Sequence, residues 1–252
     1  ELLALVRDAD VLVEGFRPEV MDKLGVGWPV LQAANPRLVM ASISGYGQTG
    51  PFARKAGHDL NYIGYAGVLD QIATREGELA IPNLQIGDLL GGTQAAVSGI
   101  LAALLAAQRS GRGRHVDVSM THVVHEHNLL ARLAVEASGR SPAPGQDLLT
   151  GGVPCYNVYR TGDGRWMAVG ALELKFWRAA CEVLGHPEWG ERHWSLGQAV
   201  GGEDAMALRE AVAAVFATRS QAEWTAAFEA ADCCVSPVLR MDEAMRHPLF
   251  NQ

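Results

Sequence analysis

Two acidic residues and one histidine occupy positions where this sequence could carry out proton transfer or nucleophilic attack. Asp88 stands in the segment GDLLGG at the start of a long apolar helical pattern, and His58 lies in the polar segment GHDLNY. A carboxylate at a helix start meets unpaired backbone N–H groups and the positive end of the helix dipole. We therefore expect Asp88 to be held ionised, and such an anion could act as a base or as a nucleophile.

Both acids also have plainer interpretations. Asp88 could be an N-cap and nothing more. However, Gly91 and Gly92 each lower helix stability by on the order of 1 kcal/mol, which indicates that some other group approaches this helix closely. Glu173 follows a strand pattern and opens a helix in the segment GALE. It could equally be an acid of a first helical turn with no further role.

Basic residues near the front of the chain could bind a phosphate. Arg17 stands between a strand pattern and a helix that begins at Pro18, a place where α/β folds often bind phosphates. Lys23 follows one to two turns later, and Arg54 and Lys55 precede His58. The alternative for each is ordinary solvated charge. A GxGxxG after the first strand and a GxxxxGK[ST] are both absent from the sequence, which excludes dinucleotide and P-loop sites on motif.

Three histidines and four cysteines raise the question of a metal site. His122 and His125 share a helix face, but His127 points elsewhere and the sequence has no HExxH, so we expect a polar helix surface rather than a zinc site. The cysteines form no CxxC pair and read as reduced thiols: Cys155, Cys181, Cys233 and Cys234. A GxSxG serine nucleophile is also absent from the sequence.

The elements that must position these residues alternate between strand and helix in the first half, which predicts a parallel or mixed sheet covered by helices. The Gly-, Pro- and Ser-rich stretch Ser138–Gly152 predicts a linker, so we place a domain boundary near residue 145. The predicted strands are 11–16, 38–44, 115–120, a hairpin of 156–159 with 165–169, and 235–239. The predicted helices are 18–24, 59 to about 72, 89 to about 109, one ending near 137, 174–184, 204–217 and 221–230.

The composition indicates a globular, soluble, cytoplasmic protein. The chain has 252 residues, 48% hydrophobic and 19% charged, and its net charge of −7 gives no electrostatic footprint for nucleic acid. The most apolar run, Ala95–Ala107, is shorter than the roughly 18 residues that a membrane span needs. The chain opens without Met inside a helical pattern and closes at 251–252 just after a short helix. We therefore expect further strand–helix units outside this sequence.

Five ordered motifs carry a resemblance to a known family. They are GFRPEVMDKLG around Arg17, SGYGQTGP, GHDLNY at 57–62, GDLLGG at 87–92 and GRGRHVDVSM at 111–120. The similarity continues through GGVPCYNVYRTGDGRWMAVGALE at 151–173 and CCVSPVLRMDEAMRHP at 233–248, so it covers nearly the whole chain. The sequence resembles the type III CoA transferase (CaiB/BaiF) family, and within it the branch of the alpha-methylacyl-CoA racemases.

The resemblance implies an α/β fold with two domains. Residues 1–145 would be part of a large Rossmann-like CoA-binding domain, and residues 146–252 part of a smaller α/β domain. Two subunits would interlock as a homodimer. The implied substrate is an acyl-CoA thioester, with coenzyme A as part of the substrate and with no prosthetic group, metal, nucleic acid or membrane as partner.

The resemblance also implies roles for individual residues. Asp88 matches the catalytic acid shared by both branches, and His58 matches the histidine that faces it in the racemases. Such a pair can remove and return a proton on opposite faces of the carbon alpha to the thioester. Glu173 matches the glutamate that pairs with that histidine. Arg17 and Lys23 match basic positions near the CoA phosphates.

Three functions remain open from the sequence. The leading one is racemisation of 2-methylacyl-CoA thioesters, in which backbone N–H groups near Asp88–Leu89 or around Asp59 would stabilise the enolate oxygen. The second is a CoA transferase in which Asp88 attacks the thioester and forms a mixed anhydride. The third is a non-catalytic module that binds CoA esters.

Overall fold

The structure is a computed structural model that describes residues 1–251. The chain divides into two compact units, Glu1–Pro142 and a second that begins at Ala143. The position of one unit relative to the other is not determined, so each is described by itself. Residue 252, the last of the segment predicted as the smaller domain, lies outside the described residues.

The first unit is built on a three-stranded parallel sheet of order β1-β2-β3. Its strands are β1 (Val11–Glu14), β2 (Val39–Ser44) and β3 (His115–Ser119). The central strand β2 is almost fully buried, which explains its unbroken apolar run. The first strand is shorter than predicted because the Glu14 carboxylate accepts the Phe16 N–H at 2.7 Å, which removes that donor from the ladder.

Three short helices lie at one end of this sheet, near the N-terminus of the chain. They are α1 (Leu2–Val6), α2 (Val20–Lys23) and α3 (Trp28–Ala34). Their shared core consists of Val6, Met21, Leu31, Leu38 and Met40. The helix predicted to begin at Pro18 begins two residues later because Glu19 adopts a left-handed φ of 70°. It ends as predicted before Gly25, whose φ is 74°.

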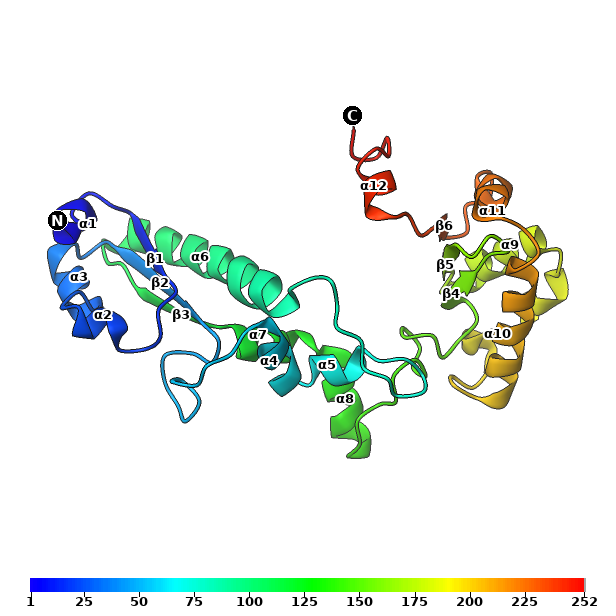
Figure 1. Ribbon diagram of the computed structural model, residues 1–252, viewed down its shortest axis with the longest axis horizontal. Helices are drawn as coiled ribbons and strands as arrows, with labels where there is room; N and C mark the ends of the chain where they lie inside the picture. The colour runs from blue at the N-terminus through cyan, green and yellow to red at the C-terminus, as the bar shows by residue number, and fades with distance from the viewer. Residues whose placement is uncertain (252) are drawn as a thin grey trace. The chain divides into compact units, whose positions relative to one another are not determined.

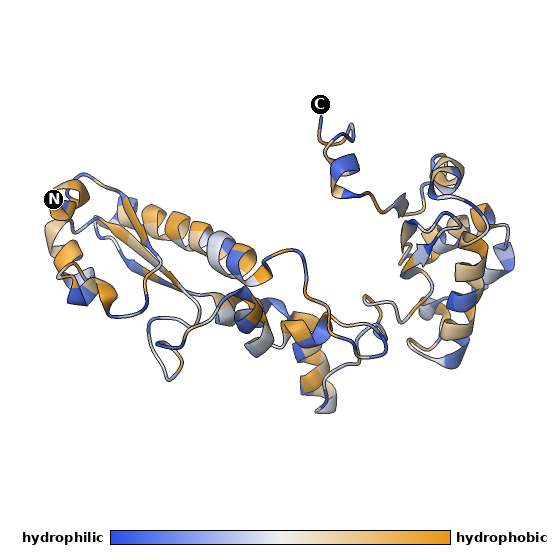
Figure 2. Cartoon of the chain, in the orientation of Figure 1, coloured by the Kyte–Doolittle hydropathy of each residue, from blue (hydrophilic) through white to orange (hydrophobic). Residues whose placement is uncertain are grey.

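A continuous helix crosses the sheet, and its first part is a π-helix. The π-helical segment η1 (Gly87–Gln94) runs directly into α6 (Ala95–Ser110), which packs on β2 and β3 (Figure 1). Its inner face is small, with Ala96, Ala103 and Ala107 buried, whereas Leu101 on its outer face is 61% exposed. Figure 2 shows the apolar character of most of α6.

This helix is longer than the apolar run considered from the sequence. At 24 residues, Gly87–Ser110 is the one helix of the described chain that could cross a membrane by length and composition alone. The expectation from Ala95–Ala107 therefore understated its length. A single such helix carries little weight, and this one lies against the sheet of the first unit.

The glycines of η1 allow the close approach that the sequence predicted. A Cβ on Gly91 would lie 2.7 Å from the Met120 carbonyl oxygen, and one on Gly92 would lie 3.1 Å from the Met120 sulfur. Met120 begins α7 (Met120–His127), so the approaching group is the neighbouring helix. These glycines let η1 and α7 pack backbone to backbone.

Gly91→Ala therefore has a different expected effect from a glycine replacement at an open helical site. We expect it to lower the free energy of unfolding by about 1–3 kcal/mol, because the added methyl overlaps the α7 backbone. Gly64→Ala is the matched control, since Gly64 is also helical and a Cβ there meets nothing within 4 Å. We expect Gly64→Ala to raise the free energy of unfolding by up to about 1 kcal/mol. Urea denaturation measures both, and equal effects would contradict the packing described here.

Two predicted helices are each broken into two. The segment predicted as one helix from 59 to about 72 consists of α4 (Asp59–Tyr65) and α5 (Val68–Gln71), because Gly67 adopts a φ of 73°. The helix predicted to end near 137 is divided at Asn128 into α7 and α8 (Leu129–Ser138). Helices α4 and α7 both pack against η1.

The second unit is an antiparallel sheet with helices packed around it. The sheet has the order β4-β5-β6, from β4 (Tyr156–Arg160), β5 (Trp166–Gly170) and β6 (Val235–Pro237). The helices are α9 (Leu174–Leu184), α10 (Glu203–Phe216) and α11 (Gln221–Phe228), with 3-10 turns η2 (Pro187–Glu191) and η3 (Trp194–Leu196). Trp177 and Trp224 are fully buried in its core. All four cysteines are free, and burial raises the pKa of the Cys155 and Cys181 thiols to about 12.

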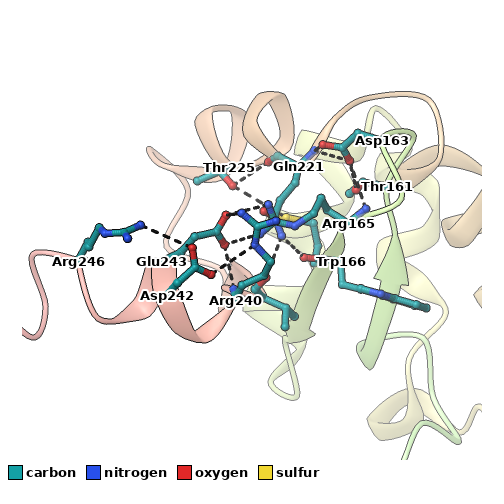
Figure 3. A network of polar contacts seen from close by, with 12 residues as sticks. Thr161, Asp163, Arg165, Trp166, Gln221, Thr225, Arg240, Asp242, Glu243 and Arg246 are labelled. Atoms are coloured by element: carbon teal, nitrogen blue, oxygen red, sulfur yellow. Dashed lines mark hydrogen bonds and ion pairs between the residues drawn. The ribbon is translucent and has the colours of Figure 1, made fainter.

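The last helix, α12 (Met241–Ala244), is tied to β5 by a polar network (Figure 3). The Arg165 guanidinium binds both carboxylate oxygens of Glu243, at 3.0 and 2.6 Å. The Arg240 N–H also donates to Glu243 at 2.9 Å. These bonds, led by those from Arg165, lower the pKa of Glu243 from 4.5 to about 2.

The network predicts a specific pH dependence of stability. Because the folded state lowers the Glu243 pKa, its contribution is complete above about pH 4.5 and is lost as the pH falls through about 2. We expect Glu243→Gln to destabilise the protein at pH 6 and to have little effect near pH 2, as measured by denaturation at each pH. Glu210→Gln is the control, since Glu210 is exposed and pairs with its neighbour Arg209. An equal effect of Glu243→Gln at both pH values would contradict the prediction.

Candidate active site

The starts of α4 and η1 lie together in the first unit and bring His58 and Asp88 into one site. His58 is the N-cap of α4, and Asp88 is the second residue of η1. The two segments are joined by a side chain, because the Asp59 carboxylate accepts the Asp88 backbone N–H at 2.9 Å. Asp88 is therefore not the N-cap that the plainer sequence interpretation offered, since that position is taken by Ile86. The π-helical turn that presents it is a rare geometry, frequent at functional sites.

The electrostatic environment of Asp88 differs from the one expected. Partial burial raises the pKa of its carboxyl group, the negative charge of Asp59 raises it further, and the charge of His58 lowers it. The helix start was expected to hold the carboxylate ionised, which would lower this pKa, so the predicted direction was wrong. Although Asp88 is an exposed residue, partial desolvation of its carboxyl group and the neighbouring carboxylate both favour the protonated form. Asp88 thus holds a proton more readily than an ordinary aspartate.

Tyr62 supports the loop that carries His58. Its ring is buried edge-on against Tyr46, with ring centroids 5.4 Å apart, and its hydroxyl donates to the Gly57 carbonyl. A Cβ on Gly57 would lie 2.7 Å from the Tyr46 hydroxyl, and one on Gly45 would lie 2.3 Å from the Tyr62 ring. Glycine is therefore required on both sides of the ring. Tyr62 belongs to the GHDLNY motif, but its support of this loop was not predicted.

A cleft of about 440 Å³ opens beside His58. Arg17 and Lys55 line it together with Asn61 and Tyr62. The structure therefore brings Arg17, the cation predicted after the first strand, to the same cleft as His58. Within residues 1–251, Arg17 has no ion-pair partner. Lys55 was recognised from the sequence as a cation before His58 but was not predicted as a site residue. Its ammonium lies 4.0 Å from the centroid of the Phe52 ring.

Lys23 is placed differently from Arg17. It does not belong to the described lining of the cleft, and its ammonium lies 3.7 Å from the Glu19 carboxylate on the exposed surface. Glu19 also binds Arg54. A role for Lys23 in binding a phosphate therefore stays a prediction from the family motif.

Two of the candidate oxyanion donors are already occupied. The Asp88 N–H donates to Asp59, and the Leu89 N–H donates to the Gln85 carbonyl at 2.9 Å. The first-turn N–H groups of Asp59 and Leu60 meet no acceptor in the described part of the chain. Of the two regions that the sequence offered, the start of α4 is the one with available donors.

Glu173 belongs to the second unit. It is the exposed N-cap residue of α9 and makes no capping bond with its side chain. The loop before it is held by the Trp194 indole N–H, which donates to the Leu172 carbonyl at 3.0 Å. Because the two units are not placed relative to each other, its predicted pairing with His58 stays a prediction.

The three histidines of α7 bind separate oxygens. His122 is 2.6 Å from the Ser119 hydroxyl, His125 is 3.1 Å from the Ala66 carbonyl, and His127 is 2.8 Å from the Val123 carbonyl, each through Nδ1. No cluster of three or more His, Cys, Asp or Glu side chains that could hold a metal occurs among the residues the structure describes.

Comparison with known sequences decides the family. The sequence profile of CoA-transferase family III matches residues 1–252. The chain belongs to that family. It is 38% identical over 248 residues to the alpha-methylacyl-CoA racemase of Homo sapiens, covering 98% of this chain and 63% of that protein. It is 32% identical over 249 residues to the acetyl-CoA:oxalate CoA-transferase of Acetobacter aceti, again covering 98% of this chain and 63% of that one.

Solved structures share the fold of this chain. A CaiB/BaiF family protein from Brucella suis superposes with a TM-score of 0.81 at 23% identity, covering 99% of this chain and 65% of that one. A hypothetical protein, Rv3272, from Mycobacterium tuberculosis gives 0.80 at 27% identity, covering 99% and 66%. This family III chain thus spans a little under two thirds of the length of the proteins that it matches.

Proposed function

We propose that this family III protein racemises 2-methylacyl-CoA thioesters by removing and returning the proton on the carbon alpha to the thioester. The observation that carries the proposal is the placement of His58 and Asp88 at the starts of α4 and η1, which the bond from the Asp88 N–H to the Asp59 carboxylate joins. Proton exchange needs two groups that each hold and release a proton near neutral pH. Partial desolvation and the negative charge of Asp59 raise the pKa of Asp88, so this carboxyl group takes up a proton more readily than an ordinary aspartate.

In the proposed mechanism His58 and Asp88 face opposite sides of the alpha carbon, and one removes a proton while the other donates one. The free N–H groups at the start of α4 would bind the enolate oxygen that forms between the two steps. Glu173 would orient His58 and stabilise its charged form. The cleft beside His58 would admit the thioester.

Arg17 and Lys55 would bind phosphates of coenzyme A in that cleft. We expect Arg17→Ala to raise KM for the acyl-CoA roughly tenfold with kcat little changed, because one charge-assisted hydrogen bond contributes about 1.5 kcal/mol. Arg54→Ala is the matched control, since Arg54 is a nearby exposed arginine that pairs with Glu19 outside the cleft lining. Steady-state kinetics of both variants test this, and equal KM values for the two would exclude Arg17 from phosphate binding.

The proposal extends to the two domains and to the dimer that the family resemblance implies. Residues 1–145 would form part of a Rossmann-like CoA-binding domain around the parallel sheet, and residues 146–252 part of a smaller domain that supplies Glu173. Two subunits would interlock as a cytoplasmic homodimer. Among the described residues no metal cluster contributes to the site, and coenzyme A enters as part of the substrate.

Chiral chromatography of the reaction mixture tests the proposal. The protein is incubated with a single enantiomer of a 2-methylacyl-CoA and with no free carboxylic acid. Appearance of the opposite enantiomer supports racemisation. Substrate that stays optically pure although the folded protein binds it would overturn the proposal.

CoA transfer is the second candidate, because a relative named as a CoA-transferase shares 32% identity over nearly the whole chain. In that reaction Asp88 would attack the thioester carbonyl and form a mixed anhydride with release of the CoA thiolate. The donor acid would then leave as its carboxylate, and the CoA thiolate would end as the thioester of the acceptor acid. Transfer of CoA to an added acid, with the alpha carbon keeping its configuration, would favour this function over the first.

A further inference from the structure

Asp59 is an acid in the first turn of α4 whose side chain does not serve α4. Its Oδ1 atom accepts the backbone N–H of Asp88, 29 residues further along the chain, at 2.9 Å. An acid in a first helical turn ordinarily remains near its own helix start, where the dipole favours it. Here the carboxylate instead fixes the backbone of the residue that carries the proposed proton chemistry.

Gly87 allows the Asp59 carboxylate to approach the Asp88 backbone closely. Gly87 is buried directly before Asp88, and a Cβ there would lie 2.9 Å from Asp59 Oδ1 and 3.4 Å from Tyr62 Cβ. The structure therefore has no space for a side chain at Gly87, where the Asp59 carboxylate approaches. Asp59 is half-buried, so the bond is only partly exposed to water.

We propose that Asp59 is a positioning residue that fixes Asp88 opposite His58 through its bond to the Asp88 backbone and acts on the Asp88 carboxyl through its negative charge. The inference rests on the proposed proton chemistry of Asp88. The elements packed against η1 are α4, α6, α7 and β3, and the charged groups that act on Asp88 are Asp59 and His58, both at the start of α4. Asp59 raises the pKa of Asp88, and His58 lowers it.

Two variants separate the bond from the charge. Asp59→Asn keeps an oxygen that can accept the Asp88 N–H but removes the charge, whereas Asp59→Ala removes both. Asp70→Asn is the matched control, because Asp70 is an exposed acid in the first turn of α5 whose side chain binds surface groups, including Ser141. Circular dichroism of each variant reports whether it folds.

The first readout does not require activity. Carbon NMR of labelled aspartate follows the Asp88 carboxyl as it titrates, and amide hydrogen exchange follows its N–H. We expect Asp59→Asn and Asp59→Ala both to lower the Asp88 pKa, and only Asp59→Ala to speed exchange of the Asp88 amide. An Asp88 titration that is unchanged in both variants would overturn the inference.

The second readout is the split between kcat and KM for alpha-proton exchange. We expect Asp59→Ala to lower kcat about 10²-fold with KM nearly unchanged, because a small misplacement of a reacting group is enough for such a loss. Asp59→Asn should recover most of that loss at a pH where Asp88 keeps the required protonation state. A full kcat in Asp59→Ala would overturn the inference. If the unaltered protein exchanges no alpha proton while the Asp88 titration still depends on Asp59, the proposed function fails and the positioning role stands.

Discussion

Asp88→Asn is expected to lower the rate of alpha-proton exchange by about 10²- to 10⁴-fold, the usual contribution of a positioned general acid or base. The amide cannot take up or release a proton at neutral pH, although it fills nearly the same space at the start of η1. Binding of the acyl-CoA should change little, because in the proposed mechanism the Asp88 carboxyl group acts on the alpha carbon, whereas Arg17 and Lys55 would bind the phosphates. Exchange into solvent, followed by NMR, gives kcat and KM separately.

The matched control for this variant is Asp70→Asn, which also removes one carboxylate from the first turn of a helix. We expect it to exchange the alpha proton at the unaltered rate. If Asp88→Asn retains full exchange activity, Asp88 is not one of the two proton-transfer groups. A loss in Asp88→Asn alone does not distinguish racemisation from CoA transfer, because both reactions use this carboxyl group.

His58→Gln is expected to abolish racemisation to a similar extent, about 10²- to 10⁴-fold, and this variant does distinguish the two reactions. A racemase needs a second proton-transfer group on the opposite face of the alpha carbon, and glutamine cannot act as one. A CoA transferase that uses Asp88 as a nucleophile has no such requirement. We therefore expect His58→Gln to lose exchange while it keeps its affinity for the acyl-CoA.

His127→Gln is the control for the histidine, since His127 is exposed on α7 and binds the Val123 carbonyl of its own helix. It should leave exchange unchanged. The affinity of each variant for the acyl-CoA is measured by calorimetry. Retention of racemisation in His58→Gln would remove His58 from the mechanism, and CoA transfer in that variant would favour the second candidate function.

The places of His58 and Asp88 in the fold were predictable from local motifs, because GHDLNY and GDLLGG each put a polar residue at a helix start. Their catalytic roles come from the family resemblance and stay predictions. The bond from Asp59 to the Asp88 backbone was not predictable, because it joins residues 29 positions apart and depends on the π-helical start of η1. The direction of the Asp88 pKa shift was missed for the same reason.

The fold shows a similar division. The strands were predictable because their apolar runs are bounded by polar or glycine residues, and β2 is buried as its sequence indicates. The break between α4 and α5 depends on the left-handed conformation of Gly67, which the apolar spacing from 59 to 72 conceals. The late start of α2 depends on the positive φ of Glu19, which its residue type does not indicate.

In the proposed reaction His58 and Asp88 exchange the proton on the carbon alpha to a CoA thioester. The most direct test is NMR of each enantiomer of a 2-methylacyl-CoA incubated with the protein in deuterium oxide without an acceptor acid. We expect both enantiomers to lose the alpha-proton signal and to converge on the same deuterated mixture. An alpha proton that is retained while the protein binds the ester would contradict it.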